Sequence, residues 1–312
     1  MTIQEFKNQA LPQLSKASPS PQLDLQVLME HALNLSKTQL LLNTNMLIPQ
    51  PQLEWLQQAV LNRCTGLPVA YITGHKEFFG YDFIVSPSVL IPKPDTEILV
   101  ERAIDVIISK MENHPDKILT ICDMCTGSGC IALSVLCALR DIYKIPQHKL
   151  PVFTLVDISK PALEIAEKNG AALNCPSDKL RFVRSNLFEQ FTYDGGWSFD
   201  LILTNPPYIP HTMVDQLLAD GRSEPRLALD GDIAINGEKA TAWDGSLCDD
   251  GLEIIRNLVF QAKKHLAPLG LILMETGEYN AKAAALHAQS HGFKTQIHKD
   301  LEGQLRVVEL QL

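Results

Sequence analysis

The sequence lacks a surplus of basic residues. Its 312 residues include 27 Lys and Arg against 36 Asp and Glu, which gives a formal net charge of −9. Proteins whose main partner is a nucleic-acid phosphate backbone usually carry an excess of positive charge. The balance therefore disfavours such a partner, although it leaves room for a local basic patch.

Long apolar runs are also missing. No stretch approaches the roughly 18 apolar residues that a membrane-spanning helix needs, and the first residues, Met1 to Glu5, lack the basic and apolar regions of a signal peptide. With 46% apolar and 20% charged residues, the composition is typical of a soluble globular protein. We therefore expect a cytoplasmic protein that does not bind a membrane.

The seven cysteines form no regular disulfide framework, and their odd number suits a reducing compartment. Cys122 and Cys125 have C-x-x-C spacing, and Cys130 follows closely. A zinc site needs a second ligand pair, and a redox motif needs a thioredoxin-like context. The sequence offers neither, so buried thiols at a strand end are favoured and no metal is expected.

Residues 1–66 are predicted to be helical. Ser20-Pro21 has the form of an N-cap followed by proline at the first helical position, and a second apolar face follows Pro51 and ends at Gly66. These helices fit a simple bundle or a partner-docking module, and the pattern does not separate the two.

Strand-forming residues dominate from Val69 to Ile91, interrupted by Gly74 and Gly80. We interpret residues 67–92 as a β-hairpin linker, with Tyr71 and Ile72 among its strand residues. A helix with acidic residues in its first turn is expected to open at Asp95–Glu97.

Residues 93–312 alternate apolar runs with helical patterns near 130–142, 160–173 and 250–266. This alternation predicts an α/β domain with a mostly parallel sheet. Two final segments, Lys294–His298 and Leu305–Leu310, leave no room for a helix between them and should form an antiparallel hairpin. That ending is expected of a Rossmann-like methyltransferase domain and differs from a dinucleotide-binding one. The expected strands of the parallel part are Ile118–Ile121, Val152–Val156, Leu180–Val183, Leu201–Leu203 and Leu271–Met274.

A glycine-containing turn follows the first of these strands, at Asp123–Gly129. Glycines between a strand and a helix let a ligand approach the backbone, but Ala132 breaks the dinucleotide spacing G-x-G-x-x-G. Asp157 ends the next strand, where a carboxylate can accept both ribose hydroxyls of an adenosine. Ser185–Phe188 ends the third strand, where an amide and an apolar side chain could frame an adenine.

The most specific signal is Asn205-Pro206-Pro207-Tyr208, directly after a buried strand. The two prolines remove two backbone donors, so carbonyls at this turn can stay unpaired and face a pocket. Asn205 adds a side-chain acceptor, and Tyr208 adds a flat face with a polar tip. Two acceptors that grip a planar NH2 group can orient its nitrogen and stabilise the positive charge that develops during methylation.

The Asn-Pro-Pro-Tyr motif after Asp123–Gly129 resembles the amino-methyltransferases, which act on amides or on exocyclic amines of bases. Further motifs resemble, more narrowly, the protein-(glutamine-N5) methyltransferases that modify peptide-chain release factors, and this resemblance covers nearly the whole chain. The segments that carry it are Arg63–Gly74, Glu77-Phe78, Val89–Glu97 and Glu224–Gly231.

The resemblance implies a helical substrate-docking domain (1–66), a hairpin linker (67–92) and a catalytic domain (93–312). It implies S-adenosylmethionine as methyl donor and the glutamine of the Gly-Gly-Gln motif of class I release factors as acceptor. The catalytic residues would be Asn205, Pro206 and Tyr208, and the substrate glutamine would be held by Asn205, Pro206, Pro207 and Tyr208. The cofactor contacts would be Cys125, Thr126, Gly127, Ser128, Gly129, Asp157, Asn186, Leu187 and Asn205.

The chain departs from the family pattern at four places. Cys125 replaces the usual first glycine of the turn, Lys93 replaces an arginine, and Asn186 replaces an aspartate. Residues 232–248 form an insert where the family runs almost directly on. The insert has few apolar residues besides Trp243, so we expect a surface excursion outside the sheet.

Three other functions compete with this hypothesis. A glutamine methyltransferase acting on a ribosomal protein resembles the chain less around Ile91–Glu97. An adenine-N6 nucleic-acid methyltransferase would share the Asn-Pro-Pro-Tyr motif but would need a basic groove or a base-recognition domain. A non-catalytic binding module would not need Asp157 and Asn205 to Tyr208.

Overall fold

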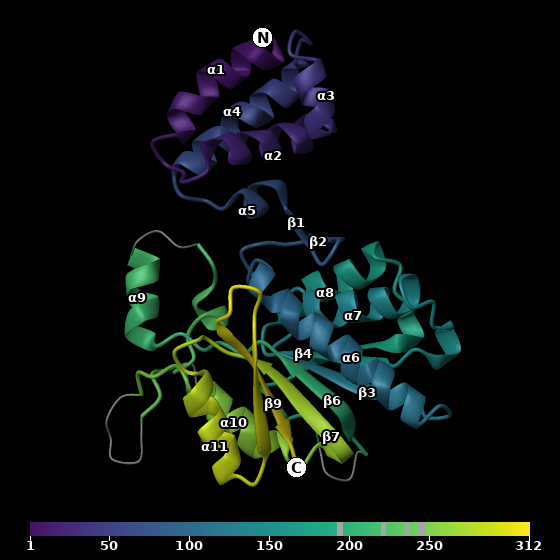
Figure 1. The fold of residues 1–312 in the computed structure, drawn as a ribbon. Helices are drawn as coiled ribbons and strands as arrows, with labels where there is room; N and C mark the ends of the chain where they lie inside the picture. The colour runs from purple at the N-terminus through teal and green to yellow at the C-terminus, as the bar shows by residue number, and fades with distance from the viewer. Residues whose placement is uncertain (192–195, 220–222, 235–237, 242–247) are drawn as a thin grey trace. The chain divides into compact units, whose positions relative to one another are not determined.

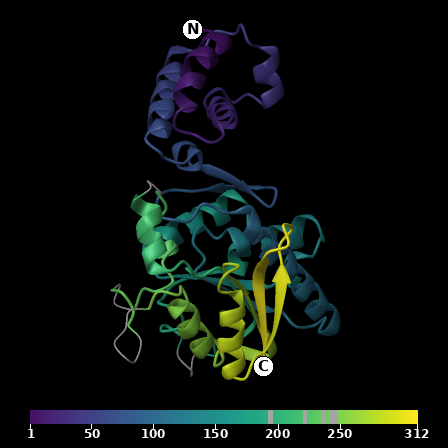
Figure 2. The same ribbon diagram turned by 60° about the vertical axis from the view of Figure 1, so that its left-hand side comes forward.

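The computed structural model describes residues 1–191, 196–219, 223–234, 238–241 and 248–312. The chain divides into two compact units (Figures 1 and 2). The N-terminal unit comprises Met1–His75 with Leu217–Ser223, and the C-terminal unit comprises Lys76–Gln216 with Glu224–Leu312. Among the described residues, no helix is long and apolar enough to cross a membrane.

The N-terminal unit is helical, as predicted. Its apolar core includes the fully buried side chains of Ile3, Leu28 and Leu56, which face one another because each helix is apolar on one side. A partly buried ion pair between Asp24 and Arg63, 2.6 Å apart, joins the second helix to the fourth. The helices are α1 (Ile3–Leu14), α2 (Pro21–Leu33), α3 (Lys37–Leu42), α4 (Gln50–Cys64) and α5 (Val69–Thr73).

One local expectation in this unit was wrong. Tyr71 and Ile72 lie in α5 and not in a strand: their N–H groups donate to the Pro68 carbonyl at 3.0 and 3.2 Å, and Gly74 ends the helix in the left-handed conformation. These local hydrogen bonds outweigh the β preference of the two side chains. Ser20 is the N-cap of α2 and Pro21 is its first residue, as predicted, although the Ser20 side chain makes no capping hydrogen bond.

The hairpin of the linker is shorter than predicted. It consists of β1 (His75–Phe78) and β2 (Tyr81–Ile84), which form a separate two-stranded sheet. Phe79 and Gly80 form the turn with φ values of +52° and +76°, which is the backbone twist that two-residue hairpin turns favour.

A seven-stranded sheet forms the centre of the C-terminal unit, in the order β5-β4-β3-β6-β7-β9-β8. The first five strands of this order are parallel, and β9 runs antiparallel to both β7 and β8. The predicted closing hairpin is therefore confirmed. The strands are β3 (Thr120–Met124), β4 (Val152–Asp157), β5 (Leu180–Arg184), β6 (Phe199–Thr204), β7 (Leu266–Glu275), β8 (Lys294–Lys299) and β9 (Leu305–Gln311).

The end of β3 and the start of β7 differ most from the prediction. β3 starts at Thr120 and continues to Met124, so Asp123 belongs to the strand and is fully buried. β7 begins at Leu266, inside the segment that we expected to be helical, with a register shift against β6. Leu269 has a positive φ near that shift, so pairing with the sheet outweighs the helical spacing there.

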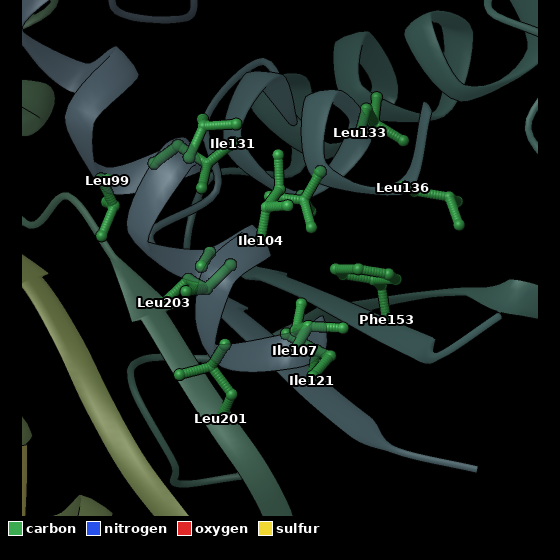
Figure 3. Packing of buried hydrophobic residues seen from close by; sticks show 14 of the residues in the cluster. Leu99, Ile104, Ile107, Ile121, Ile131, Leu133, Leu136, Phe153, Leu201 and Leu203 are labelled. Atoms are coloured by element: carbon green, nitrogen blue, oxygen red, sulfur yellow. The ribbon is translucent and has the colours of Figure 1, made fainter. Parts of the chain in front are cut away.

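Helices cover both faces of the sheet (Figure 1). Figure 3 shows how side chains of α6 and α7, among them Leu99, Ile104 and Leu133, meet Phe153 and Leu201 on the strands. A second apolar cluster joins α10 and α11 to the other face. The helices that cover the sheet are α6 (Glu97–Asn113), α7 (Cys130–Asp141), α8 (Lys160–Ala172), α10 (Glu253–Ala262) and α11 (Ala281–Ser290). A further helix, α9 (His211–Ala219), contributes no residue to either apolar cluster among the described residues, and η1 (Pro94–Thr96) is a short 3-10 turn before α6.

This topology brings distant segments to one edge of the sheet. The parallel strands β5, β4, β3 and β6 are neighbours, so the residues that follow them emerge side by side. The carboxyl edge of such a sheet is where open α/β folds bind ligands. The predicted turn after β3, Asp157, Asn186 and Asn205 all lie there.

Candidate active site

A cavity of about 300 Å³ opens at this edge, within the C-terminal unit. Nine of the predicted site residues line it, together with residues that precede α6 and the segment 225–234. Such a volume and mixed lining are typical of small-molecule sites. The nine residues are Cys125, Thr126, Gly127, Ser128, Asp157, Asn186, Leu187, Asn205 and Pro207.

The turn after β3 exposes its backbone to the cavity. Cys125, where the family pattern has glycine, adopts φ +61°, a conformation that disfavours a Cβ but is accommodated here. Gly127 has φ +56°, and a Cβ added to it would meet no atom within 4 Å. Gly127 therefore leaves open space in front of the backbone. A Cβ at Gly129, by contrast, would lie 2.9 Å from Leu133, so this glycine serves packing of the turn on α7.

Asp157 ties the turn to the end of β4. Its two carboxylate oxygens accept the N–H groups of Gly127 and Ser159, each at 2.9 Å. Burial raises the pKa of Asp157, and these backbone hydrogen bonds oppose the rise. The carboxylate thus lies at the cavity wall in a fixed orientation.

Asp123 is a buried carboxylate that the sequence analysis did not select. One oxygen accepts the Thr126 hydroxyl at 2.6 Å and the Ala132 N–H at 3.3 Å, and these bonds fix the turn from below. Burial raises the pKa of Asp123 to about 7. Its position next to the glycine turn could have identified Asp123 as a supporting residue. We expected β3 to end at Ile121, however, which would have placed Asp123 in an exposed turn.

The segment after β5 forms another wall. Leu187 has φ +47°, and the Asn186 side-chain amide donates to Glu189 at 3.0 Å. Phe188 is directed away into the core, where its ring stacks on His265 with centroids 4.8 Å apart. Asn186 and Leu187 therefore line the cavity, while Phe188 supports them.

The Asn-Pro-Pro-Tyr segment follows β6 and reaches the cavity at Asn205 and Pro207. The Asn205 amide nitrogen lies 3.4 Å from the Thr96 hydroxyl. Tyr208 donates its hydroxyl to Glu275 at 3.3 Å, and burial raises its pKa. Pro206 and Tyr208 do not contribute to the cavity lining as the structure describes it.

The backbone of Tyr208 is tightly held. Its carbonyl accepts hydrogen bonds from Tyr279 at 3.2 Å and Asn280 at 2.9 Å, so it is not one of the open acceptors expected at this turn. Gly251, with φ +72°, packs against it: a Cβ at Gly251 would lie 2.1 Å from the Tyr208 carbonyl oxygen. A side chain is excluded at this contact.

Two segments of the family pattern meet beside the cavity. The Lys93 ammonium lies 2.7 Å from the buried Glu224 carboxylate, and Lys93, Pro225 and Leu227 all line the cavity. The lysine in place of the usual arginine thus still forms an ion pair.

The insert 232–248 is not a surface excursion at its start. Asp232 is fully buried and accepts the N–H of Gly251 at 2.8 Å, while Ile233 and Ala234 line the cavity. None of its described residues joins the seven-stranded sheet. Trp243, the exception to the polar composition of the insert, lies outside the described residues.

Comparisons with known proteins agree with this geometry. Residues 5–74 match the model of the PrmC N-terminal domain, and residues 99–238 match the methyltransferase small domain. A release factor glutamine methyltransferase from Koribacter versatilis is 33% identical over 310 residues, which cover 99% of this chain and 98% of that protein. The chain belongs to the release factor glutamine methyltransferase family.

Two further relatives either are longer than this chain or match a smaller part of it. A bifunctional methyltransferase of Rickettsia typhi is 31% identical over 99% of this chain, but the chain spans only 57% of that relative's length. A solved release-factor-specific protein-(glutamine-N5) methyltransferase from Alicyclobacillus acidocaldarius is 26% identical, with a TM-score of 0.39 over 73% of this chain and 98% of that one.

Membership of this methyltransferase family confirms the expected fold class and S-adenosylmethionine as the cofactor. The residues present fit that group. The open backbone at Gly127 and the fixed carboxylate of Asp157 face the same cavity. Nothing in the packing of the protein requires glycine at position 127, so the open space there suits a ligand that approaches the main chain.

Proposed function

We propose that the chain transfers a methyl group from S-adenosylmethionine to the side-chain amide nitrogen of a glutamine. The acceptor would be the glutamine in the Gly-Gly-Gln motif of class I release factors. The observation that carries this proposal is that Asn205 opens onto the same cavity as Asp157. A methyl acceptor bound by Asn205 and a methyl donor bound by Asp157 would then lie in the same cavity.

Residues at three strand ends would hold the cofactor. Asp157 would accept the ribose hydroxyls, Asn186 and Leu187 would contact the adenine, and the Cys125–Gly129 backbone would face the amino-acid part. Asn205 would also contact it. When bound, S-adenosylmethionine supplies an electrophilic methyl group on a positively charged sulfur. The protein contributes orientation and a partly dry environment, in which electrostatic interactions are stronger than in water.

The acceptor side rests on Asn205, Pro206, Pro207 and Tyr208. The Asn205 side-chain oxygen and a backbone carbonyl of the proline pair would accept the two N–H bonds of the glutamine amide. This grip would turn the nitrogen towards the methyl group and stabilise its developing positive charge. The hydrogen bonds on Tyr208 hold the motif in place before substrate arrives.

One amide contact does not distinguish a release factor from other glutamine-containing proteins, so a second surface must add affinity. The helical region 1–66 is our candidate for docking, with 67–92 as linker and 93–312 as catalytic domain. Neither a membrane nor a nucleic acid is an expected partner. Because translation termination takes place in the cytoplasm, we place the reaction there.

The test is mass spectrometry after the pure protein is incubated with labelled cofactor and a class I release factor. The proposal predicts one methyl group on the Gly-Gly-Gln glutamine, and a glutamine-to-asparagine release factor as control should gain none. Methylation of a ribosomal protein in place of the factor, or of adenine in DNA or RNA, would select one of the alternative functions. Failure to bind S-adenosylmethionine would favour the alternative that the protein is a non-catalytic binding module.

A further inference from the structure

A buried carboxylate, Glu275, lies behind the Asn-Pro-Pro-Tyr segment and has no role in the methyl transfer described above. Glu275 ends β7, next to β6, and only 2% of its surface is exposed. One oxygen accepts the Tyr208 hydroxyl at 3.3 Å. The other, Oε2, is buried without a well-formed hydrogen bond in the described part of the chain.

Glu275 connects to Asn205 as well as to Tyr208. The Thr96 hydroxyl is close enough to Glu275 to affect its ionisation, and the same hydroxyl lies 3.4 Å from the Asn205 amide nitrogen. Thr96 itself is buried and lines the cavity, whereas Glu275 does not. Glu275 therefore contacts two groups that surround the methyl-acceptor position, and it has no direct contact with the cavity.

Charged and titratable groups from four segments of the chain interact with Glu275. Arg306, on the neighbouring β9, pairs with Asp95 at 3.2 Å and Asp300 at 3.0 Å, so its charge is shared among several carboxylates. The groups that interact with Glu275 electrostatically are Asp95 before α6, Cys130 on α7, Tyr208 after β6 and Arg306 on β9. Burial raises the pKa of Glu275 to about 7.

We propose that Glu275 is a positioning residue whose negative charge, acting through Thr96 and Tyr208, stabilises the positive charge that reaches the acceptor nitrogen. This inference rests on the proposed function. In the reaction, the amide nitrogen forms the new C–N bond with its lone pair, the electron pair of the broken methyl–sulfur bond stays on sulfur, and one N–H proton is lost to water. A carboxylate on the nitrogen side favours that movement of charge in a medium of low dielectric constant.

The first test needs neither substrate nor cofactor. Glu275 should titrate near pH 7 in the folded chain and near pH 4.3 when unfolded, so the folded state holds an extra proton between these values. Folding stability should therefore fall as pH rises from 5 to 8. Glu275→Gln should remove the part of this loss that Glu275 causes, while the buried Asp123 keeps its own part. The Tm of the variant minus that of the wild type should therefore grow by roughly 5 °C over this range. Parallel profiles would overturn the assignment of a protonatable buried carboxylate.

The second test is the pH profile of methylation. For the wild-type chain, kcat should increase with pH through about 7, since the ionised form is the active one. Glu275→Gln should lower kcat roughly 10²-fold at pH 8, flatten the profile and leave the KM for the cofactor nearly unchanged. Glu275→Asp, which keeps the charge, should recover part of the rate and of the pH dependence. The matched control is Glu278→Gln, an exposed carboxylate in the same loop.

Thr96→Val tests whether Glu275 acts on the acceptor site through the Thr96 hydroxyl. If Glu275 acts through this hydroxyl, the effects of Thr96→Val and Glu275→Gln on kcat should be less than additive. Unchanged kcat and pH profile in Glu275→Gln would sink the inference while the proposed function stood. A wild-type chain that methylated no release factor at any pH would count against the function, and the stability profile would still decide the state of Glu275.

Discussion

Lys93 and Glu224, 131 positions apart in the sequence, form an ion pair 2.7 Å long at the rim of the cavity. The Glu224 side chain is nearly buried, whereas the Lys93 side chain is 37% exposed. Solvent therefore screens the pair on one side. Its main effect is to connect the segment before α6 to the segment after α9, both of which line the site.

Lys93→Met should lower the free energy of unfolding by about 1 kcal/mol, after allowance for this exposure. Lys93→Arg should be nearly neutral, because a guanidinium can reach the same carboxylate. Chemical denaturation of both variants measures the difference. Equal stability of the wild type and Lys93→Met would show that the ion pair is not needed for folding.

Asp157→Ala should weaken S-adenosylmethionine binding by about 1–3 kcal/mol, the scale of hydrogen bonds to a charged group. The loss combines the proposed ribose contact with the release of the Gly127 N–H, which Asp157 now accepts. Calorimetry gives the affinity, and Asp178→Ala, an exposed site away from the cavity, is the control. An unchanged Kd would remove Asp157 from the cofactor site.

Asn205→Ala should reduce turnover by roughly 10²-fold, the range seen when one preorganised charge-stabilising group is lost. Stability should be nearly kept, because within the described part of the chain the Asn205 side chain makes one long hydrogen bond, of 3.4 Å, to Thr96. Single-turnover methylation and a thermal melt measure the two effects. The exposed Asn113→Ala serves as control, and full activity of Asn205→Ala would contradict the proposed mechanism.

Asp232→Ala should lower the free energy of unfolding by about 1–3 kcal/mol, because the Gly251 N–H would lose its buried acceptor. Deletion of the whole insert 232–248 should therefore destabilise the fold, contrary to what composition alone predicts. Lys239→Ala removes an exposed side chain of the same segment and should have little effect. A deletion variant as stable as the wild type would refute this view.

Docking by the N-terminal unit can be tested with its exposed leucines. Leu41, Leu42 and Leu47 are 62%, 79% and 70% exposed and lie in one short stretch of the chain, and exposed apolar side chains are candidates for contact with a partner. Leu42→Asp should raise the KM for intact release factor and leave cofactor affinity and activity on a short Gly-Gly-Gln peptide unchanged. Equal effects on protein and peptide would argue against docking at this surface.

The sequence predicted those parts of the fold that depend on local pattern. Alternating apolar runs identified the parallel sheet, and the short spacing between the last two strands identified the antiparallel hairpin. Boundaries were less accurate where tertiary pairing decides, as at Leu266 in β7. The proposed acceptor residues Asn205 to Tyr208 could be predicted from the sequence, because all four are consecutive and form one recognisable motif.

Supporting residues could not be predicted in the same way. Thr96 and Glu275 approach the motif only after the chain folds, since Glu275 lies 67 positions from Tyr208. Nothing in the local pattern distinguishes a carboxylate that ends a buried strand from one at the surface. The burial of Asp232 escaped prediction for the same reason: its partner, Gly251, is on the far side of the insert.

The contact between Gly251 and the Tyr208 carbonyl has a practical consequence. Asp232 accepts the Gly251 N–H, and Gly251 fits against Tyr208 only without a side chain, so the two ends of the segment 232–251 are held together by their own contacts. The distance between these ends is then independent of how many residues join them, and lengthening a connection costs little entropy. A reporter peptide spliced into the middle of this segment should leave the acceptor motif in place, whereas one alanine at position 251 should displace it.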